Sequence, residues 1–190
     1  PQPHPDPYTQ LDYSATLFYC LAAVNAAVYD EQANSSTNNP VRARVREYLA
    51  KQNPASLAPL RRFVCDHKPK NPSAELSQYI SFALWSKGAP DFTWANPDLP
   101  APADADALYE FPPVLAAFYR DANLGGLWPQ VQAEYEAAIA QYSQLVTLAV
   151  QQVDAYFHYA NTGTRPGRFQ LLIALIGSPN QVHMPNFLDH

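Results

Sequence analysis

The chain has 190 residues, of which 47% are hydrophobic and 15% are charged, and its formal net charge is −5 at pH 7. This hydrophobic share is too high for a disordered chain, and the length suits one domain with a sizeable core. A net negative chain without a basic arm is unsuited to nucleic acid or an anionic membrane surface, and no apolar run reaches the roughly eighteen residues that a membrane span needs.

The first ten residues, PQPHPDPYTQ, have Pro at alternate positions and are predicted to form an extended arm. Such a stretch often follows a cleaved signal peptide, so we expect an extracytoplasmic location, periplasmic or secreted, with the signal peptide removed. The rest of the chain is predicted to form a helical domain over 11–162 and a strand-containing segment over 163–190.

Five helices are predicted before residue 124, separated by stiff loops, because the chain has 19 Pro and only 6 Gly. Phe92 and Trp94, in the long loop 89–106, are expected to fold back onto the helices. Basic side chains after Pro40 are expected to face water. The predicted helices span about 12–29, 41–51, 56–66, 73–87 and 108–122, and the basic residues are Arg42, Arg44, Arg46 and Lys51.

The LGG sequence at 124–126 is expected to break the chain before one long helix at about 128–157. Pro129 fits the first turn of that helix, and no Gly or Pro follows it there. Apolar residues recur at steps of three and four, which indicates one continuous apolar face against which shorter helices can pack. The predicted fold class is therefore mainly α, a multi-helix bundle around this helix with a short C-terminal strand. The face consists of Val131, Tyr135, Ala138, Tyr142, Leu145, Ala149, Val153 and Tyr156.

The run FQLLIALI (169–176) lies between Gly167 and Gly177 and is too short for a buried helix. It is predicted to be a β-strand covered on both faces. The segment 182–190 is the one other extended piece expected, and a lone two-stranded hairpin is marginally stable. We therefore expect further strands from a missing C-terminal portion beyond His190, or self-association or another subunit through strand 169–176.

The two cysteines, Cys20 and Cys65, allow two interpretations. The chain has no C-x-x-C pair, which excludes a redox motif or a zinc ribbon. One interpretation is a disulfide that ties the first predicted helix to the third in an oxidising compartment. The other is two buried thiols that act as small hydrophobic groups. Geometry decides between them, and the sequence leaves both open.

No motif assigns a catalytic, cofactor-binding or metal-binding residue. The sequence lacks G-x-S-x-G, a P-loop and G-x-G-x-x-G, and no two histidines have the H-E-x-x-H spacing. We interpret the histidines as surface or supporting residues and the acids near helix ends as favourable charge placement. These residues are His4, His67, His158, His183, His190, Glu110, Asp121, Glu134 and Glu136.

Aromatic residues are concentrated between positions 109 and 128. Core packing is the default interpretation of such a group. The alternative is a groove that binds a ligand, which would make the chain a small-ligand-binding helical bundle. The group consists of Tyr109, Phe111, Phe118, Tyr119 and Trp128.

Two segments, VLAAFYRDANLGGLWPQVQAEYEAAIAQY (114–142) and FQLLIALIG (169–177), carry a family resemblance. Together they resemble the helical N-terminal half of a poorly characterised group of bacterial secreted proteins that are similar to H-E-x-x-H zinc metallopeptidases. The zinc-binding helix of that family has no counterpart in these 190 residues, so no catalytic or metal residue can be transferred. The resemblance implies a non-catalytic scaffold that shapes one wall of a cleft, and a metallopeptidase only if a zinc-binding half follows.

The alternative function is a stand-alone helical protein-interaction module, akin to a tetratricopeptide array. Helix pairs with many Tyr, Ala and Leu residues fit that class. Against it, the chain has no internal repeat of about 34 residues, and an apolar terminal strand is foreign to such arrays. Bound metal with peptidase activity in a longer product would favour the scaffold, whereas peptide binding without metal would favour the module.

Overall fold

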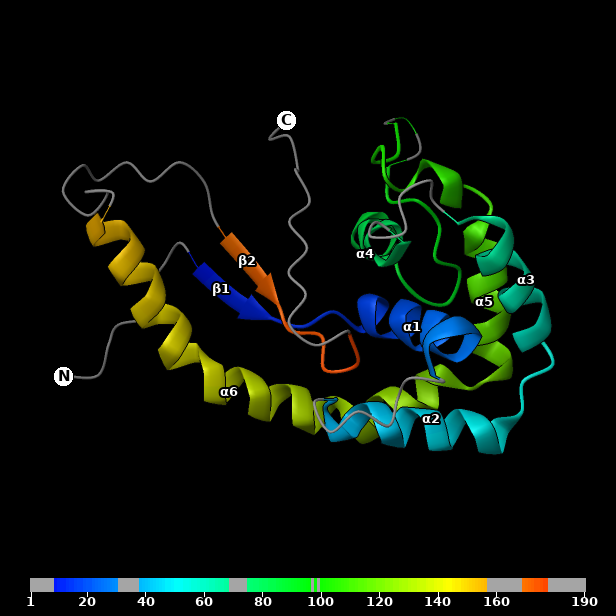
Figure 1. Ribbon diagram of the computed structural model, residues 1–190, viewed down its shortest axis with the longest axis horizontal. Coiled ribbons are helices and arrows are strands. Elements are labelled where there is room, and N and C mark those ends of the chain that lie inside the picture. Colours follow the sequence, from blue (N-terminus) through cyan, green and yellow to red (C-terminus); the bar gives the residue numbers. More distant parts are fainter. Residues whose placement is uncertain are drawn as a thin grey trace. The chain divides into compact units, whose positions relative to one another are not determined.

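The computed structural model describes residues 9–30, 38–68, 75–96, 98, 100–156 and 169–177 (Figure 1). The predicted fold class is confirmed, since these residues are mainly helical, with one long helix and a short two-stranded sheet. They divide into two compact units. Unit 1 draws on Pro1–Ser14 and Gln130–Ala174, and unit 2 draws on Ala15–Pro129 and Leu175–His190. The predicted segments 1–10, 11–162 and 163–190 are each continuous in sequence. Each compact unit of the structure instead combines two stretches that are separate in sequence.

Helix α1 (Ala15–Val24) is buried on all sides within unit 2. Every residue of its sequence LFYCLAAV, from position 17 to 24, is buried. A helix that is apolar all round belongs in a core, because it has no polar face to turn toward water. It packs against α4 (Glu75–Trp85) and α5 (Phe111–Asp121), as Figure 1 shows. The core of unit 2 is therefore built around α1.

The helix continues beyond Val24 as a wider π-helix, η1 (Asn25–Tyr29). The sequence predicted this extent to Tyr29 but not the change of helix type. Asn25 and Ala26 are buried in η1, so a polar amide lies inside the unit. Because a buried amide needs hydrogen-bond partners, Asn25 makes contacts with two distant segments, which are described below.

Helices α2 (Pro40–Gln52) and α3 (Leu57–Asp66) begin close to where the sequence places them. The side chain of Asn39 caps α2 by accepting a hydrogen bond from the Val41 amide at 2.9 Å. Pro40 lies in the first turn, where no amide donor is needed. The prediction that Arg42 faces water is wrong, because its side chain is only 6% exposed.

Polar residues on α4 are buried because they hold the surrounding loops. Ser81 Oγ donates to a carboxylate oxygen of Asp104 at 2.7 Å, just before the 3₁₀ helix η4 (Asp106–Leu108). Gln78 Nε2 donates to the carbonyl oxygen of His67 at 3.2 Å. These bonds satisfy Ser81 and Gln78 inside the unit and fix the loops on either side of α4.

The loop after α4 folds back on the helices, as predicted. Phe92 is fully buried, and its amide donates to the Gly88 carbonyl at 2.8 Å. Trp94 packs edge-on against Phe82, with ring centroids 5.1 Å apart. Gly88 has a φ of 84°, and an added Cβ would lie 2.7 Å from Thr16 Oγ1. Glycine is needed there both for the left-handed backbone and for the close approach of α1.

The chain turns between α5 and α6 (Leu124–Tyr156) at Asn123, and not at the LGG sequence. Asn123 has a φ of 48°, a left-handed conformation that Asn tolerates better than most residues. Gly125 and Gly126 therefore lie inside α6, which begins four residues earlier than predicted. Pro129 is inside the helix rather than in its first turn, so the Gly125 carbonyl lacks its usual helical donor.

Unit 1 contains a parallel two-stranded sheet of β1 (Thr9–Asp12) and β2 (Phe169–Leu172), which lie side by side in Figure 1. Leu11 pairs with Leu171 in the register of the sheet. The strand predicted at 169–176 is thus shorter than expected. Its described partner comes from the segment predicted as an arm and a helix start. The segment 182–190, predicted as a second extended piece, lies outside the described residues.

The prediction that β2 is covered on both faces is wrong. Gln170 and Leu171, on opposite faces of the sheet, are both exposed, Leu171 by 42%. On the polar face, the Gln10 and Gln170 side chains both donate to Asp12, at 3.2 and 3.5 Å. The apolar run therefore predicted a strand correctly, but the burial of both of its faces is not observed.

Tyr13, directly after β1, connects the sheet to the part of α6 in unit 1. Its hydroxyl accepts a hydrogen bond from Gln132 Nε2 at 3.1 Å and lies 3.4 Å from an oxygen of Glu136. Its ring packs edge-on against Tyr135, with centroids 5.9 Å apart. These contacts cover α6 around Tyr135 from within unit 1.

Candidate functional site

No group of three or more His, Cys, Asp or Glu side chains that could hold a metal is found within the described part of the chain. His67 stacks on Phe63 with ring centroids 3.8 Å apart, and its Nδ1 lies 2.8 Å from the Phe63 carbonyl oxygen, so it supports the end of α3. The other four histidines lie outside the described residues: His4, His158, His183 and His190. Among the described helices, none is long and apolar enough to cross a membrane.

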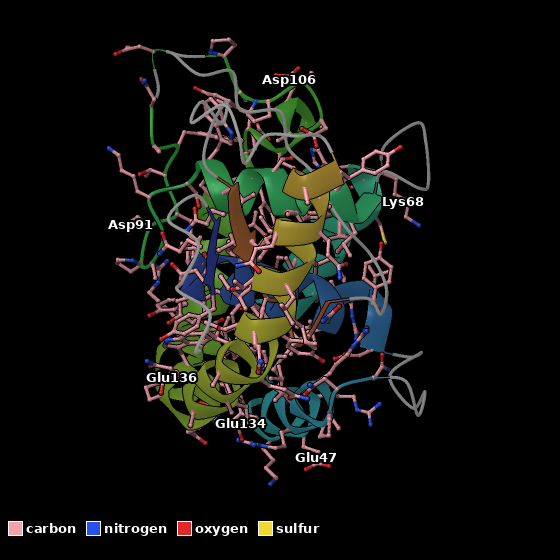
Figure 2. All side chains as sticks on the ribbon, turned by 90° about the vertical axis from the view of Figure 1, so that its left-hand side faces the viewer. Glu47, Lys68, Asp91, Asp106, Glu134 and Glu136 are labelled. Atoms are coloured by element: carbon pink, nitrogen blue, oxygen red, sulfur yellow. The ribbon has the colours of Figure 1, made fainter. Side chains whose placement is uncertain are left out.

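The acidic side chains near helix ends do not converge on one point. Asp121 accepts a hydrogen bond from the Ser56 amide at 3.1 Å and thereby holds the start of α3. Glu136 accepts from Gln132 at 3.0 Å. Figure 2 shows Glu134 and Glu136 on different sides of α6, as expected for residues two positions apart on a helix. Acid–base chemistry by a pair of these carboxylates is therefore not supported by their placement.

Both cysteines are free thiols in this structure, so the candidate bridge between Cys20 and Cys65 is not formed. Cys20 is fully buried in α1, and its Sγ lies 3.4 Å from the Tyr79 carbonyl oxygen. Burial raises the pKa of the Cys20 thiol, which keeps it protonated and unreactive. Cys65 is exposed on α3, so the interpretation as two buried thiols holds for Cys20 alone.

The aromatic group predicted as a core or a groove separates into three environments. Phe111 and Phe118 are fully buried, which matches the default interpretation of core packing. Tyr109 is 72% exposed, although only one residue separates it from Phe111. Tyr119 and Trp128 are half-buried and meet through Tyr19 of α1. The five residues therefore do not line a single groove.

The ring of Tyr19 lies 4.9 Å from that of Tyr119 and 6.3 Å from that of Trp128. Burial, together with the neighbouring Tyr119 hydroxyl, raises the pKa of Tyr19 to about 12. Gly125 leaves space for this pair, since an added Cβ would lie 2.5 Å from the Tyr119 hydroxyl. The Tyr19 phenol is protonated near neutral pH, so it can donate hydrogen bonds but cannot serve as a base.

Three guanidinium groups gather at the end of η1. Arg42, Arg46 and Arg61 donate to the carbonyl oxygens of Tyr29, Asp30 and Ala26 at 3.2, 3.5 and 3.4 Å. Cations are favoured at this negative end of a helix, where carbonyl groups lack helical donors. Burial raises the pKa of Asp30, and the three arginines act in the opposite direction. Stabilisation of this helix end explains why the three arginines lie together there.

The apolar face of α6 changes from buried to exposed along its length. Val131, Tyr135 and Ala138 are buried, as the predicted packing requires. Beyond Ala138, the same face is exposed, so the expectation of packing along the whole helix is wrong for its second half. We name this second half the distal stripe, and it consists of Tyr142 (45% exposed), Leu145 (60%), Ala149 (exposed), Val153 (53%) and Tyr156 (78%).

The distal stripe is the strongest candidate for a functional surface. Ile139, Val146 and Val150 occupy the neighbouring side of α6 and are half-buried, so the helix is partly covered within unit 1. Leu148 adds a further large apolar side chain that is 44% exposed. A contiguous exposed apolar patch of this kind is typical of a protein–protein contact. Sequence periodicity found the stripe but could not show that it is exposed.

Comparison of the chain with protein-family models, with characterised proteins and with solved structures finds no match. The resemblance of 114–142 and 169–177 to metallopeptidase-like proteins therefore stays a prediction. In the structure, segment 114–142 covers most of α5, the turn at Asn123 and the first half of α6.

Proposed function

We propose that this chain is a non-catalytic helical scaffold that acts by binding a protein chain through the distal stripe. The observation that carries the proposal is the continuation of one apolar face of α6 from buried residues, up to Ala138, to exposed residues from Tyr142 onward. Burial of a Leu or Val side chain contributes roughly 1.5–3 kcal/mol, so covering this stripe would stabilise a complex.

The sheet of unit 1 supports the same proposal. A two-stranded sheet is marginal by itself, and among the described residues β1 and β2 pair only with each other. Leu171 of this sheet is 42% exposed, so unit 1 offers apolar surface beyond the stripe. Unit 2, by contrast, has a complete core around α1, which suits a stable platform.

Photo-crosslinking can test the proposal in the organism that makes the protein. A photoreactive benzoylphenylalanine replaces Leu145 of the stripe in one variant and Ala140 in the other. Ala140 is also exposed, and it lies nine residues from Ala149, on the opposite side of α6 at about 100° per residue. We expect a covalent adduct with another protein chain from position 145 and none from position 140. Equal labelling at both positions, or none at either, would refute the proposal.

The family resemblance specifies one form of this scaffold. In that form, the bound protein is a zinc-binding catalytic half, and the present chain shapes one wall of its cleft. What supports it is the segment FYRDANL with the following Trp128, at the turn between α5 and α6. The test is the reading frame after His190. An H-E-x-x-H helix within the next several dozen codons supports this form, whereas a stop codon there together with a monodisperse monomer in solution removes it.

A further inference from the structure

We propose, building on the proposed function, that the distal stripe binds the distal stripe of a second copy of this chain, as an antiparallel pair of α6 helices centred on Ala149. A second copy is an alternative occupant of the stripe to the zinc-binding catalytic half that the family resemblance implies. It rests on the symmetry of the stripe, on its lack of charge and on the covering of the adjacent half of the helix.

The stripe is symmetric about Ala149. Leu145 and Val153 lie four residues to either side of Ala149, and Tyr142 and Tyr156 lie seven residues to either side. The pattern therefore reads Tyr, Leu, Ala, Val, Tyr in one direction and Tyr, Val, Ala, Leu, Tyr in the other. In an antiparallel two-fold pair each residue meets the one at the mirrored position in the partner, so Leu145 would meet Val153 and Tyr142 would meet Tyr156, which are residues of similar type.

The residue types suit the positions that this pair would give them. All five residues lie within about 80° around the helix, so they form one seam about 21 Å long. Ala149 at the centre is small and allows the two helices to approach closely. Leu and Val would form the next layer on each side. A tyrosine at each end would pack its ring against the partner and keep its hydroxyl in reach of water.

The five residues of the stripe carry no charge that would oppose pairing with a second copy. No Asp, Glu, Lys or Arg occurs between positions 137 and 153, although the whole chain carries a net charge of −5. Two copies of an acidic face would repel each other, because like charges across an interface oppose association. The stripe avoids this repulsion, and the glutamines that flank it on one side, Gln141 and Gln152, are uncharged.

The buried part of the helix decides the direction of pairing. Tyr13 packs against Tyr135, so the first half of the apolar face is already covered within unit 1. In a parallel pair, the two covered halves would lie next to each other and hold the helices apart. In an antiparallel pair centred on Ala149, the paired seam runs from Tyr142 to Tyr156 of each copy. Tyr135 and its cover by Tyr13 lie outside this seam in both copies.

Disulfide trapping tests the register of the pair. Each variant carries Cys65→Ser, because Cys65 is exposed, whereas Cys20 is buried and is left in place. Ala149→Cys should oxidise to a species with the mass of two chains. Ala140→Cys, on the opposite side of the helix, is the matched control and should stay at the mass of one chain.

A second pair of variants tests the direction. Leu145→Cys alone should not form a disulfide, because its two copies would be about 12 Å apart along the helix axis. A mixture of Leu145→Cys and Val153→Cys chains should form a mixed disulfide. Efficient bridging of Leu145→Cys with itself would show a parallel pair and overturn this proposal.

Sedimentation of the unmodified protein tests the dimer without cross-linking. We expect the mass of two chains, and Leu145→Glu should weaken association at least tenfold while the helical circular dichroism stays unchanged. Ala140→Glu should leave the dimer intact. A monomer in sedimentation with no trapping at position 149 would overturn the dimer. If position 145 still photo-crosslinks to a protein of another mass, the proposed function survives and only the identity of the partner is wrong.

Discussion

The side-chain amide of Asn25 donates a hydrogen bond of 2.8 Å to the main-chain carbonyl of Ile176. Both residues are buried, and 151 positions of sequence separate them. The amide oxygen of Asn25 accepts a bond from Arg42 Nη2 at 3.4 Å. One buried side chain thus connects the π-helix η1, helix α2 and the segment after β2.

Replacing Asn25 with Ala should lower the free energy of unfolding by about 2 kcal/mol, because it leaves a buried carbonyl and a buried guanidinium less satisfied. Urea unfolding followed by circular dichroism measures the change. Asn96→Ala is the control, since Asn96 is exposed and should change stability by less than about 0.5 kcal/mol. Similar losses in both variants would show that the buried position of Asn25 is unimportant.

Gly125→Ala should destabilise unit 2 by about 1–3 kcal/mol, although Ala is normally the better helix former. The cause is the added Cβ, which would lie 2.5 Å from the hydroxyl of Tyr119. Combining it with Tyr119→Phe removes that hydroxyl, so the double variant should recover at least about 1 kcal/mol in a double-mutant cycle. Strictly additive effects would contradict the steric explanation.

Phe111 and Tyr109 provide a matched test of core packing against a ligand groove. Phe111 packs against Phe63, Tyr79 and Phe82, with ring centroids 5.3, 5.2 and 5.1 Å apart. Phe111→Ala should therefore cost about 3–5 kcal/mol of stability. Tyr109→Ala should change stability by no more than about 0.5 kcal/mol, because the side chain is mostly exposed. Thermal unfolding of the two variants checks both values, and a large loss on removing Tyr109 would contradict its exposure.

Tyr19 should make stability depend on pH in the alkaline range. Its pKa is about 12 in the folded protein and about 10 in an unfolded chain. Ionisation therefore begins first in the unfolded state, and the free energy of unfolding should fall as the pH rises from about 10 toward 12. Tyr19→Phe should show a shallower fall over the same interval. Urea unfolding at pH 9.0 and 10.5 measures the slopes, and equal slopes would contradict the raised pKa.

Local patterns in the sequence predicted most helices because their signals act over a few residues. The cap at Asn39, the Pro residues that open α2 and α5 and the apolar run of α1 specify helices without reference to distant contacts. The start of α6 was harder to predict. Gly125 and Gly126 suggest a break in the helix. Their close approach to Tyr119 and Asn123 leaves no space for a larger side chain, and this reason for Gly is compatible with an unbroken helix.

The sequence by itself determined the mainly helical fold, the long helix and the apolar face along it, because periodicity depends only on the order of residues. It could not determine which part of that face is covered, since burial depends on segments far away in the sequence. Tertiary structure decided that Tyr13 covers Tyr135, that β1 pairs with β2 and that Cys20 is remote from solvent while Cys65 is not. It also left Leu145 and Val153 exposed, although their pattern is the same as that of Val131 and Ala138, because no described segment of the chain packs fully over that half of the helix.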